Sequence, residues 1–344
     1  MNIKSLLIGS AAALAAVSGA QAADAIVAAE PEPMEYVRVC DAFGTGFFYI
    51  PGTETCLKFG GYVRFQTNFG RDASGTSDWN SFTRAQFEVD TRTDTELGAL
   101  RGFIGFRGNA ESGSSSDSSV FVDQAFIELG GLKAGKFYSE WDNDLNGETD
   151  ILSTNALFNA VRYTYDAGAF SAYIAAEELQ GTSFVGSSET DNNVGISAFV
   201  GGTAGPVTYS LVGSYDVDYE DGAIRAMLFA DVGPGTFGLA GVWASGVNAY
   251  YAESEWAVAV EYAIKATDKL TITPAFQYLG SVATKTVDGD IVDADWSNND
   301  AWTAGLTVDY KITDGLAAKV TANYYDEDGQ DDEVTGFVRL QRSF

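Results

Sequence analysis

The sequence predicts an all-β fold, a 16-stranded antiparallel transmembrane β-barrel, from three observations. Segments in which apolar and polar residues alternate recur from Leu57 to the C-terminus, with little helical pattern between them. The connectors alternate between short turns and long polar loops. The segments number sixteen, and membrane barrels made from one bacterial chain have an even number of antiparallel strands. A soluble β-sandwich is the weaker alternative, because its sheets rarely carry so many Arg, Glu, Gln and Asn residues on one face.

The N-terminus predicts a secretory signal peptide. Lys4 is the only early charge, an apolar run extends from Leu6 to Val17, and Ala20-Gln21-Ala22 forms a small-residue cleavage site. The apolar run is shorter than the roughly 20 residues of a spanning helix, so an N-terminal anchor is the weaker alternative. The predicted organisation is a signal peptide over 1–22, an N-terminal periplasmic segment over 23–55, and a transmembrane barrel over 56–344.

The N-terminal segment also contains the first of the chain's two cysteines. Cys40 and Cys56 lie 16 positions apart, and two cysteines in an oxidising compartment most simply pair. Such a disulfide would contribute about 3 kcal/mol in the chain-entropy model. Two separate buried thiols are the alternative, and no metal site is expected from two cysteines in a chain without histidine.

The alternation defines the strands one by one. In the first segment Phe59 and Phe65 fall on one face and Arg64 on the other, and in the second Phe87 alternates with Gln86. We assign the apolar face to lipid and the polar face to the interior. The predicted strands are 57–69, 84–92, 99–107, 120–129, 132–139, 159–166, 170–177, 194–201, 207–218, 224–232, 237–245, 256–265, 270–282, 302–312, 316–325 and 334–344.

The connectors support the same topology. Short ones occur at 93–96, 130–131, 203–205, 233–235, 267–268 and 313–315, and long ones at 109–119, 140–157, 178–193, 283–299 and 326–333. Short turns on one rim and long loops on the other are typical of outer-membrane barrels. The chain ends in Phe344 after an amphipathic segment, which resembles the assembly signal of such barrels, although Arg342 replaces the apolar residue usual at the third position from the end.

Charge and composition exclude several functions. The net charge of −28 argues against nucleic-acid binding, and the absence of His removes triad catalysis and His-containing zinc sites. Gly130, Gly135 and Lys136 fit part of a phosphate-binding P-loop, but Phe137 stands where Ser or Thr should follow. We therefore expect neither an enzyme nor a cofactor.

Four stretches carry a family resemblance: ADAIVAAEPEP over 23–33, YVRVCD over 36–41, GFFYIPGTETCL over 46–57, and the terminal RLQRSF over 339–344. AGKFYS over 134–139 also matches. Together they resemble the general porins of alphaproteobacteria, of the rhizobial and Brucella type. The resemblance implies a homotrimeric diffusion pore in the outer membrane of a Gram-negative bacterium, with the third loop folded into the lumen.

If the third loop folds inward as in that family, acidic and basic residues would face each other at a pore constriction. The acidic loop residues are Glu140, Asp142, Asp144, Glu148 and Asp150. The basic wall, taken from the polar faces of the strands around the loop, consists of Arg64, Arg84, Arg101, Arg107 and Arg162. Lys133 and Lys136 fall on opposite faces of one strand, and the sequence leaves open which of them faces the interior.

The expected function is passive diffusion of small hydrophilic solutes and ions, with selectivity set by pore width and lining charge. A solute-specific channel, for example for sugars, is the first alternative, and a structural surface barrel or barrel enzyme is the second. Expected partners are outer-membrane lipid and lipopolysaccharide, with Ca²⁺ or Mg²⁺ bridging to the acidic residues of long loops such as 326–333.

Overall fold

The computed structural model describes residues 38–70, 79–111, 119–179, 183–184, 187–188, 193–285 and 291–344. The predicted signal peptide and residues 23–37 lie outside the described residues, as do parts of the predicted loops 109–119, 178–193 and 283–299. No helix within the described ranges is long and apolar enough to cross a membrane.

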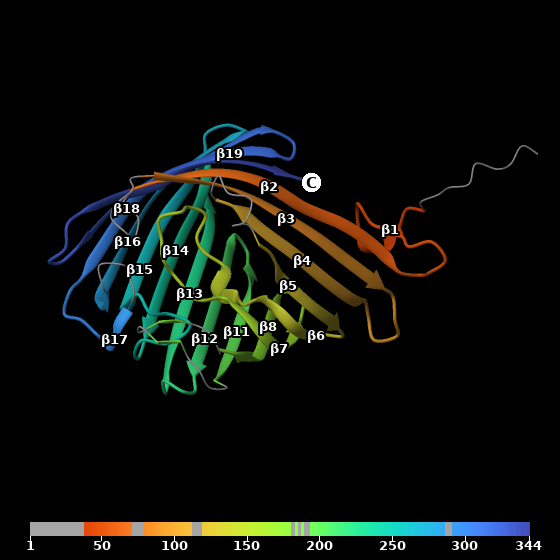
Figure 1. Ribbon diagram of the computed structural model, residues 1–344, viewed down its shortest axis with the longest axis horizontal. Coiled ribbons are helices and arrows are strands. Elements are labelled where there is room, and N and C mark those ends of the chain that lie inside the picture. The colour runs from red at the N-terminus through yellow and green to blue at the C-terminus, as the bar shows by residue number, and fades with distance from the viewer. Residues whose placement is uncertain are drawn as a thin grey trace, which may run out of the picture. The chain divides into compact units, whose positions relative to one another are not determined.

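Sixteen antiparallel strands form one closed sheet (Figure 1). They are β2 (Cys56–Phe69), β3 (Trp79–Thr93), β4 (Leu100–Ala110), β5 (Val120–Leu129), β6 (Leu132–Tyr138), β7 (Leu157–Asp166), β8 (Phe170–Glu178), β11 (Val194–Ala204), β12 (Val207–Asp216), β13 (Asp221–Val232), β14 (Gly235–Ala244), β15 (Ser254–Lys265), β16 (Leu270–Lys285), β18 (Ala301–Thr313), β19 (Leu316–Glu327) and β20 (Glu333–Ser343). Shorter elements are β1 (Phe48–Tyr49), β9 (Ser183–Phe184), β10 (Ser187–Ser188), β17 (Ile291–Trp296) and two 3-10 helices, Asp41–Phe43 and Glu140–Asp142. Each of the sixteen predicted segments falls on one of the sixteen strands, so the predicted barrel is confirmed.

Pairing of the first and last long strands closes the barrel. Phe65 of β2 lies opposite Leu340 of β20. Gly61 and the terminal Phe344 exchange two backbone hydrogen bonds, of 3.2 and 3.1 Å. Closure leaves no long strand with an unpaired edge, which a sheet in lipid requires because no water is available to satisfy its backbone groups.

The two faces of the sheet differ as the alternation predicts. Phe87 and Leu306 project from the outer face, where they are 43% and 45% exposed. Gln86, one residue from Phe87, is 6% exposed on the inner face and hydrogen-bonds to Glu88 and Arg107. A shift of one residue in register would exchange these faces, so the pattern determines the register.

The two rims carry different connectors. The short-turn rim consists of 94–99, 130–131, 167–169, 205–206, 233–234, 266–269 and 314–315. The opposite, long-loop rim carries the long connectors such as 139–156 and 245–253, although two of its connectors, 217–220 and 328–332, are shorter than 94–99. Gly130 and Gly131 have φ angles of 56° and 87°, the left-handed values that a two-residue hairpin turn requires. Gly135 and Lys136 lie within strand β6, so the P-loop interpretation is excluded.

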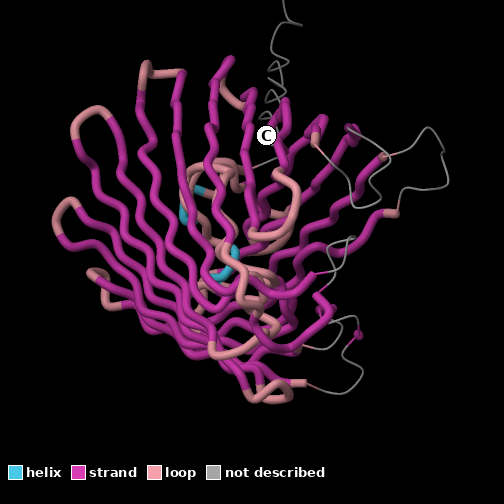
Figure 2. Tube along the Cα trace, turned by 90° about the vertical axis from the view of Figure 1, so that its left-hand side faces the viewer, coloured by secondary structure: helices cyan, strands magenta, loops and turns pink. Residues whose placement is uncertain are grey.

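Part of the barrel interior is filled by apolar packing. Interior side chains of β13, β14 and β15 are small and buried, namely Ala223, Ala240, Val242, Ala257 and Ala259. They belong to one apolar cluster with Trp141, Leu145 and Leu152 from the β6–β7 connector (residues 139–156) and with Tyr250 and Tyr251 from the β14–β15 loop (residues 245–253). Figure 2 shows loops inside the ring of strands. Small wall residues therefore provide the space that these two loops occupy.

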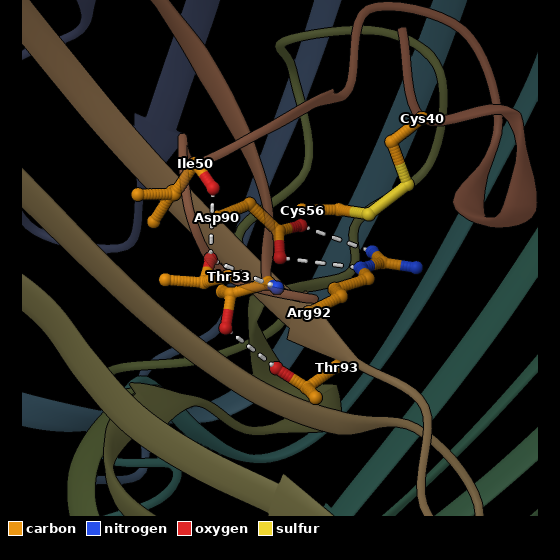
Figure 3. Close-up of a disulfide and its surroundings, with 8 residues drawn as sticks. Cys40, Ile50, Thr53, Cys56, Asp90, Arg92 and Thr93 are labelled. Carbon is orange, nitrogen blue, oxygen red and sulfur yellow. Dashed lines mark hydrogen bonds and ion pairs between the residues drawn. A yellow bond between two sulfur atoms is a disulfide. The ribbon is translucent and has the colours of Figure 1, made fainter. Parts of the chain in front are cut away.

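A disulfide joins the N-terminal segment to the start of the barrel (Figure 3). Cys40 and Cys56 are bonded, with Cα atoms 6.0 Å apart, so the predicted pairing is confirmed. Strand β1 pairs with β2 through Phe48 opposite Leu57. The Arg92 guanidinium lies 5.1 Å from the centre of the Phe47 ring, which attaches the segment to the barrel beside the disulfide.

Candidate functional site

The β6–β7 connector begins with a 3-10 turn, Glu140–Asp142, that is capped by Ser139. The Ser139 side chain accepts a hydrogen bond from the Trp141 backbone N–H at 3.3 Å. The Trp141 side chain is fully buried, and its Nε1–H donates to Ser214 Oγ on β12 at 2.8 Å. This contact holds the start of the connector against β12, four strands from β6 along the sheet.

Arg225 on β13 binds the connector through its backbone. Its guanidinium donates to the carbonyl oxygens of Trp141 and Leu152, at 3.1 and 3.2 Å, and to that of Glu140. Arg225 is 1% exposed, and a buried cation is tolerated only where acceptors surround it. The three carbonyls come from both ends of the connector, so Arg225 ties those ends together.

Two further side chains hold the connector's middle. Glu261 on β15 accepts from the backbone N–H groups of Asn146 and Gly147, both at 2.7 Å, and from the Asn146 side chain at 2.6 Å. Gln277 on β16 accepts from the Ile151 N–H and donates to the Ile151 carbonyl, both at 2.7 Å. Hydrogen bonds to an ionised carboxylate are the stronger kind, so Glu261 is the main anchor of this part.

Glu148 connects the same segment to the basic side of the barrel. Its carboxylate lies 2.7 Å from Lys319 Nζ on β19 and 3.5 Å from an Arg339 nitrogen on β20. Its backbone N–H donates to Thr307 Oγ1 at 3.0 Å, and its carbonyl accepts from Asn323 at 3.0 Å. The connector thus contacts side chains of strands from β12 to β20.

The β14–β15 loop packs behind the connector and was not predicted to take part in the site. The Thr154 N–H donates to the Tyr250 carbonyl at 2.9 Å, and the Ala252 N–H donates to Thr154 Oγ1 at 2.8 Å. The Tyr250 hydroxyl donates to Glu177 at 2.8 Å. Burial and the Glu177 carboxylate raise the pKa of Tyr250 above its usual range, so this hydroxyl remains a donor.

The five acidic residues of the connector have different surroundings. Asp142 and Asp144 are exposed, with Asp144 4.0 Å from Arg225, while Glu140 and Glu148 are partly buried. Asp150 has one carboxyl oxygen that is buried without a hydrogen-bond partner among the described residues. Burial, reinforced by the neighbouring Asp144, raises the pKa of Asp150 to about 7.

Three of the five predicted basic residues come together on β2, β3 and β4. Arg64 and Arg84 lie directly opposite each other and donate to the amide oxygens of Gln341 and Asn109, each at 2.8 Å. Arg107 pairs with Asp123 at 2.9 Å. We call this group, together with two basic residues that were not selected from the sequence, the arginine wall: Arg64, Arg84, Arg107, Lys319 and Arg339. Arg339 lies on the polar face of the last strand, so the alternation together with barrel closure beside β2 could have identified it.

The other two predicted residues lie elsewhere on the inner wall. Arg101 is six residues from Arg107 along β4, roughly 20 Å at the rise of a β-strand, and it pairs with Asp90 at 3.0 Å. Arg162 lies over the rings of Phe137 and Tyr173. Lys133 shares this inner face, whereas Lys136 lies on the opposite face, which settles the choice that the sequence left open.

No group of three or more His, Cys, Asp or Glu residues that could hold a metal ion occurs in the described ranges.

The chain is similar to proteins of one family along nearly its whole length. Residues 24–340 match the family model described as a porin subfamily. The chain is 49% identical to outer membrane protein IIIA of Rhizobium leguminosarum bv. viciae, covering 98% of this chain and 93% of that protein. It is 35% identical to porin Omp2b of Brucella neotomae, with both chains covered completely.

Solved structures show the same fold at low sequence identity. The outer membrane channel DcaP of Acinetobacter baumannii superposes with a TM-score of 0.66 at 16% identity, covering 86% of this chain and 99% of that chain. The trimer form of OmpT of Vibrio cholerae superposes with a TM-score of 0.61 at 14% identity, covering 85% and 100%.

Proposed function

This chain belongs to the porin family and forms an outer-membrane channel, and from that premise we propose that it admits small hydrophilic solutes and ions by passive diffusion. The observation that carries the proposal is the β6–β7 connector, which is bonded to interior side chains of β13, β15, β16, β18 and β19. Because the connector is bonded at so many points, it would narrow the passage as a fixed constriction and would not act as a mobile gate. We assign it the role of constriction loop.

The charges on either side of the passage would set its selectivity. In this proposal Asp142 and Asp144 of the connector face Arg64, Arg84 and Arg107 across the passage, while Glu148 contacts Lys319 and Arg339 of the arginine wall directly. Such opposed charges create a transverse field that orders water, so an apolar solute would displace oriented water without replacing its hydrogen bonds. Polar solutes would therefore pass more readily.

The aromatic rings beside the arginine wall favour a general channel over a sugar-specific one. Arg64 lies 5.0 Å from the Tyr62 ring centre, Arg84 5.3 Å from that of Phe82, and Arg339 4.1 Å from that of Phe337. A guanidinium thus covers a face of each ring, where a sugar would otherwise stack. This arrangement leaves no continuous row of bare rings on this part of the wall.

Assembly and surface partners complete the proposal. We assign a homotrimer, supported by the trimer form of the structurally similar OmpT. We further assign to the acidic loop between β19 and β20, with Asp328, Asp331 and Asp332, an association with lipopolysaccharide through divalent cations. We assign the barrel no enzymatic activity.

Swelling of proteoliposomes in neutral sugars tests passive diffusion. The swelling rate should fall smoothly as sugar size increases and should not saturate with concentration, because no binding step limits passage. Vesicles without protein provide the background rate. A larger sugar that enters faster than a smaller one, or a saturable rate, would favour the solute-specific alternative.

Asp150 should make the ion preference depend on pH. Its pKa of about 7 means that the carboxyl loses its proton between about pH 5.5 and about pH 8.5, which adds a negative charge to the connector. Cation preference should therefore increase with pH in the wild type, and by less in Asp150→Asn. Because the pKa of Asp150 is raised in the folded barrel, its protonated form stabilises the folded state. This contribution is complete at pH values below the usual carboxyl range and is lost as pH rises through about 7. Reversal potentials that show the same pH dependence in both proteins would contradict this assignment.

A further inference from the structure

Two adjacent cations on the inner wall lack a carboxylate partner. Lys133 on β6 and Arg162 on β7 are direct register partners, and like charges in that position are destabilising. Within the described residues, neither forms an ion pair within 4.0 Å or a hydrogen bond to a protein acceptor. The chain has 48 acidic residues against 20 basic ones, so carboxylates are abundant overall, and their absence beside Lys133 and Arg162 is particular to this site.

Aromatic rings form the floor beneath these cations. Lys133 Nζ lies 3.9 Å from the Phe126 ring centre and 4.4 Å from that of Phe137. The Arg162 guanidinium carbon lies 4.9 Å from the Phe137 ring centre and 4.7 Å from that of Tyr173. Phe137 is 1% exposed, so the cations cover it. The rings stabilise positive charge but accept no conventional hydrogen bond, so Lys133 Nζ and the terminal guanidinium nitrogens of Arg162 remain available to another acceptor, while Arg162 Nε is buried.

Several interior cations have a protein acceptor, which Lys133 and Arg162 lack. Arg64 and Arg84 are also direct register partners without an ion pair, but each donates to an amide oxygen. Arg107 pairs with Asp123 and Lys319 with Glu148. Glu128, the register partner of Lys133 on β5, has its carboxylate 3.6 Å from Arg101. The nearest acid across the strands is thus engaged with another cation. Together with Arg101, these residues form a row on the inner wall between the short-turn rim and the base of the constriction loop.

We propose that Lys133 and Arg162 bind a small oxyanion of the phosphate class as it passes through the barrel. An anion with several acceptor oxygens can bridge an ammonium and a guanidinium and offset their mutual repulsion. The inner face excludes lipid headgroups, so the ligand is a dissolved anion. This inference rests on the proposed channel function and adds to it a binding step on the short-turn side of the constriction.

Single-channel recording in KCl with added inorganic phosphate tests the site. Phosphate should reduce the wild-type current in a saturable way. In the double variant Lys133→Gln/Arg162→Gln the phosphate concentration for half-maximal effect should rise about tenfold or more, as expected for the loss of charge-assisted hydrogen bonds. Lys136→Gln, on the outer face of the same strand, is the matched control and should behave as the wild type.

Further variants separate the possible outcomes. Lys133→Arg keeps the positive charge and should retain the phosphate effect. If the double variant does not fold, the single variant Arg162→Gln takes its place and should weaken the phosphate effect. Equal phosphate sensitivity in wild type and Arg162→Gln, or loss of the effect only in Arg84→Gln at the arginine wall, would overturn the site. A wild-type protein that carries no KCl current would instead refute the channel function itself.

Discussion

Glu261→Gln should raise the single-channel conductance, because it releases the middle of the constriction loop. The Glu261 carboxylate accepts three hydrogen bonds from Asn146 and Gly147. A glutamine has one acceptor oxygen and would direct its NH₂ group at the Gly147 N–H or at the Asn146 donors. Loss of each charge-assisted bond costs about 1.5–3 kcal/mol, enough to detach a segment that projects into a hydrated passage.

The matched control for this prediction is Glu88→Gln. Glu88 also lies on the inner face, but its side-chain bond is to Gln86 of its own strand. Its conductance in concentrated KCl should stay near that of the wild type. Arg225→Met, which removes the donors to three connector carbonyls, should act in the same direction as Glu261→Gln. An unchanged or lower conductance in both anchor variants would show that the connector does not limit the passage.

Phe87→Arg should impair membrane assembly. Phe87 lies on the outer face of β3, and a cation on the lipid face near mid-depth costs about 2–4 kcal/mol. Leu306→Arg on β18 should have a similar effect. The measurement is the free energy of unfolding in urea with the barrel folded in lipid vesicles.

The control for the lipid face is Ala317→Arg. Ala317 lies on the inner face of β19, opposite Gln341, and is exposed to the interior. Gln86 is a poorer control than its polar pattern suggests, because it accepts a hydrogen bond from Arg107 at 3.0 Å that the substitution would remove. Equal loss of stability in Phe87→Arg and Ala317→Arg would contradict the assigned faces.

The strands could be predicted because lipid imposes a strict pattern. A strand with one face in lipid must alternate, so Phe59 against Arg64 and Phe87 against Gln86 were sufficient to assign faces. The disulfide followed from a secretory signal and two cysteines. These are local signals that do not depend on which strands become neighbours.

The site required information that the pattern lacks. Depth in the barrel follows from register and strand tilt, so Arg101 could not be separated from Arg107 by sequence alone. Arg225 is a single basic residue within an apolar strand, and its partners are backbone carbonyls, which leave no sequence signal. Ala240 and Ala257 have side chains too small to indicate that a loop packs against them. Because these wall residues are small, nothing in the sequence indicated that the β14–β15 loop packs against them.

The central claim is that the acidic connector and the arginine wall determine ion passage, and the reversal potential across a planar bilayer under a KCl gradient tests it most directly. The wild type should show stepwise conductance with mild cation preference at low salt, which weakens as the Debye length falls from about 10 Å at 0.1 M to about 3 Å at 1 M. Neutralising Asp142, Asp144 and Glu148 to Asn or Gln should shift the reversal potential toward anions. The same change at Asp328, Asp331 and Asp332 of the long-loop rim should shift it less. Anion preference of the wild type at low salt, or a larger shift from the rim set than from the connector set, would contradict the account.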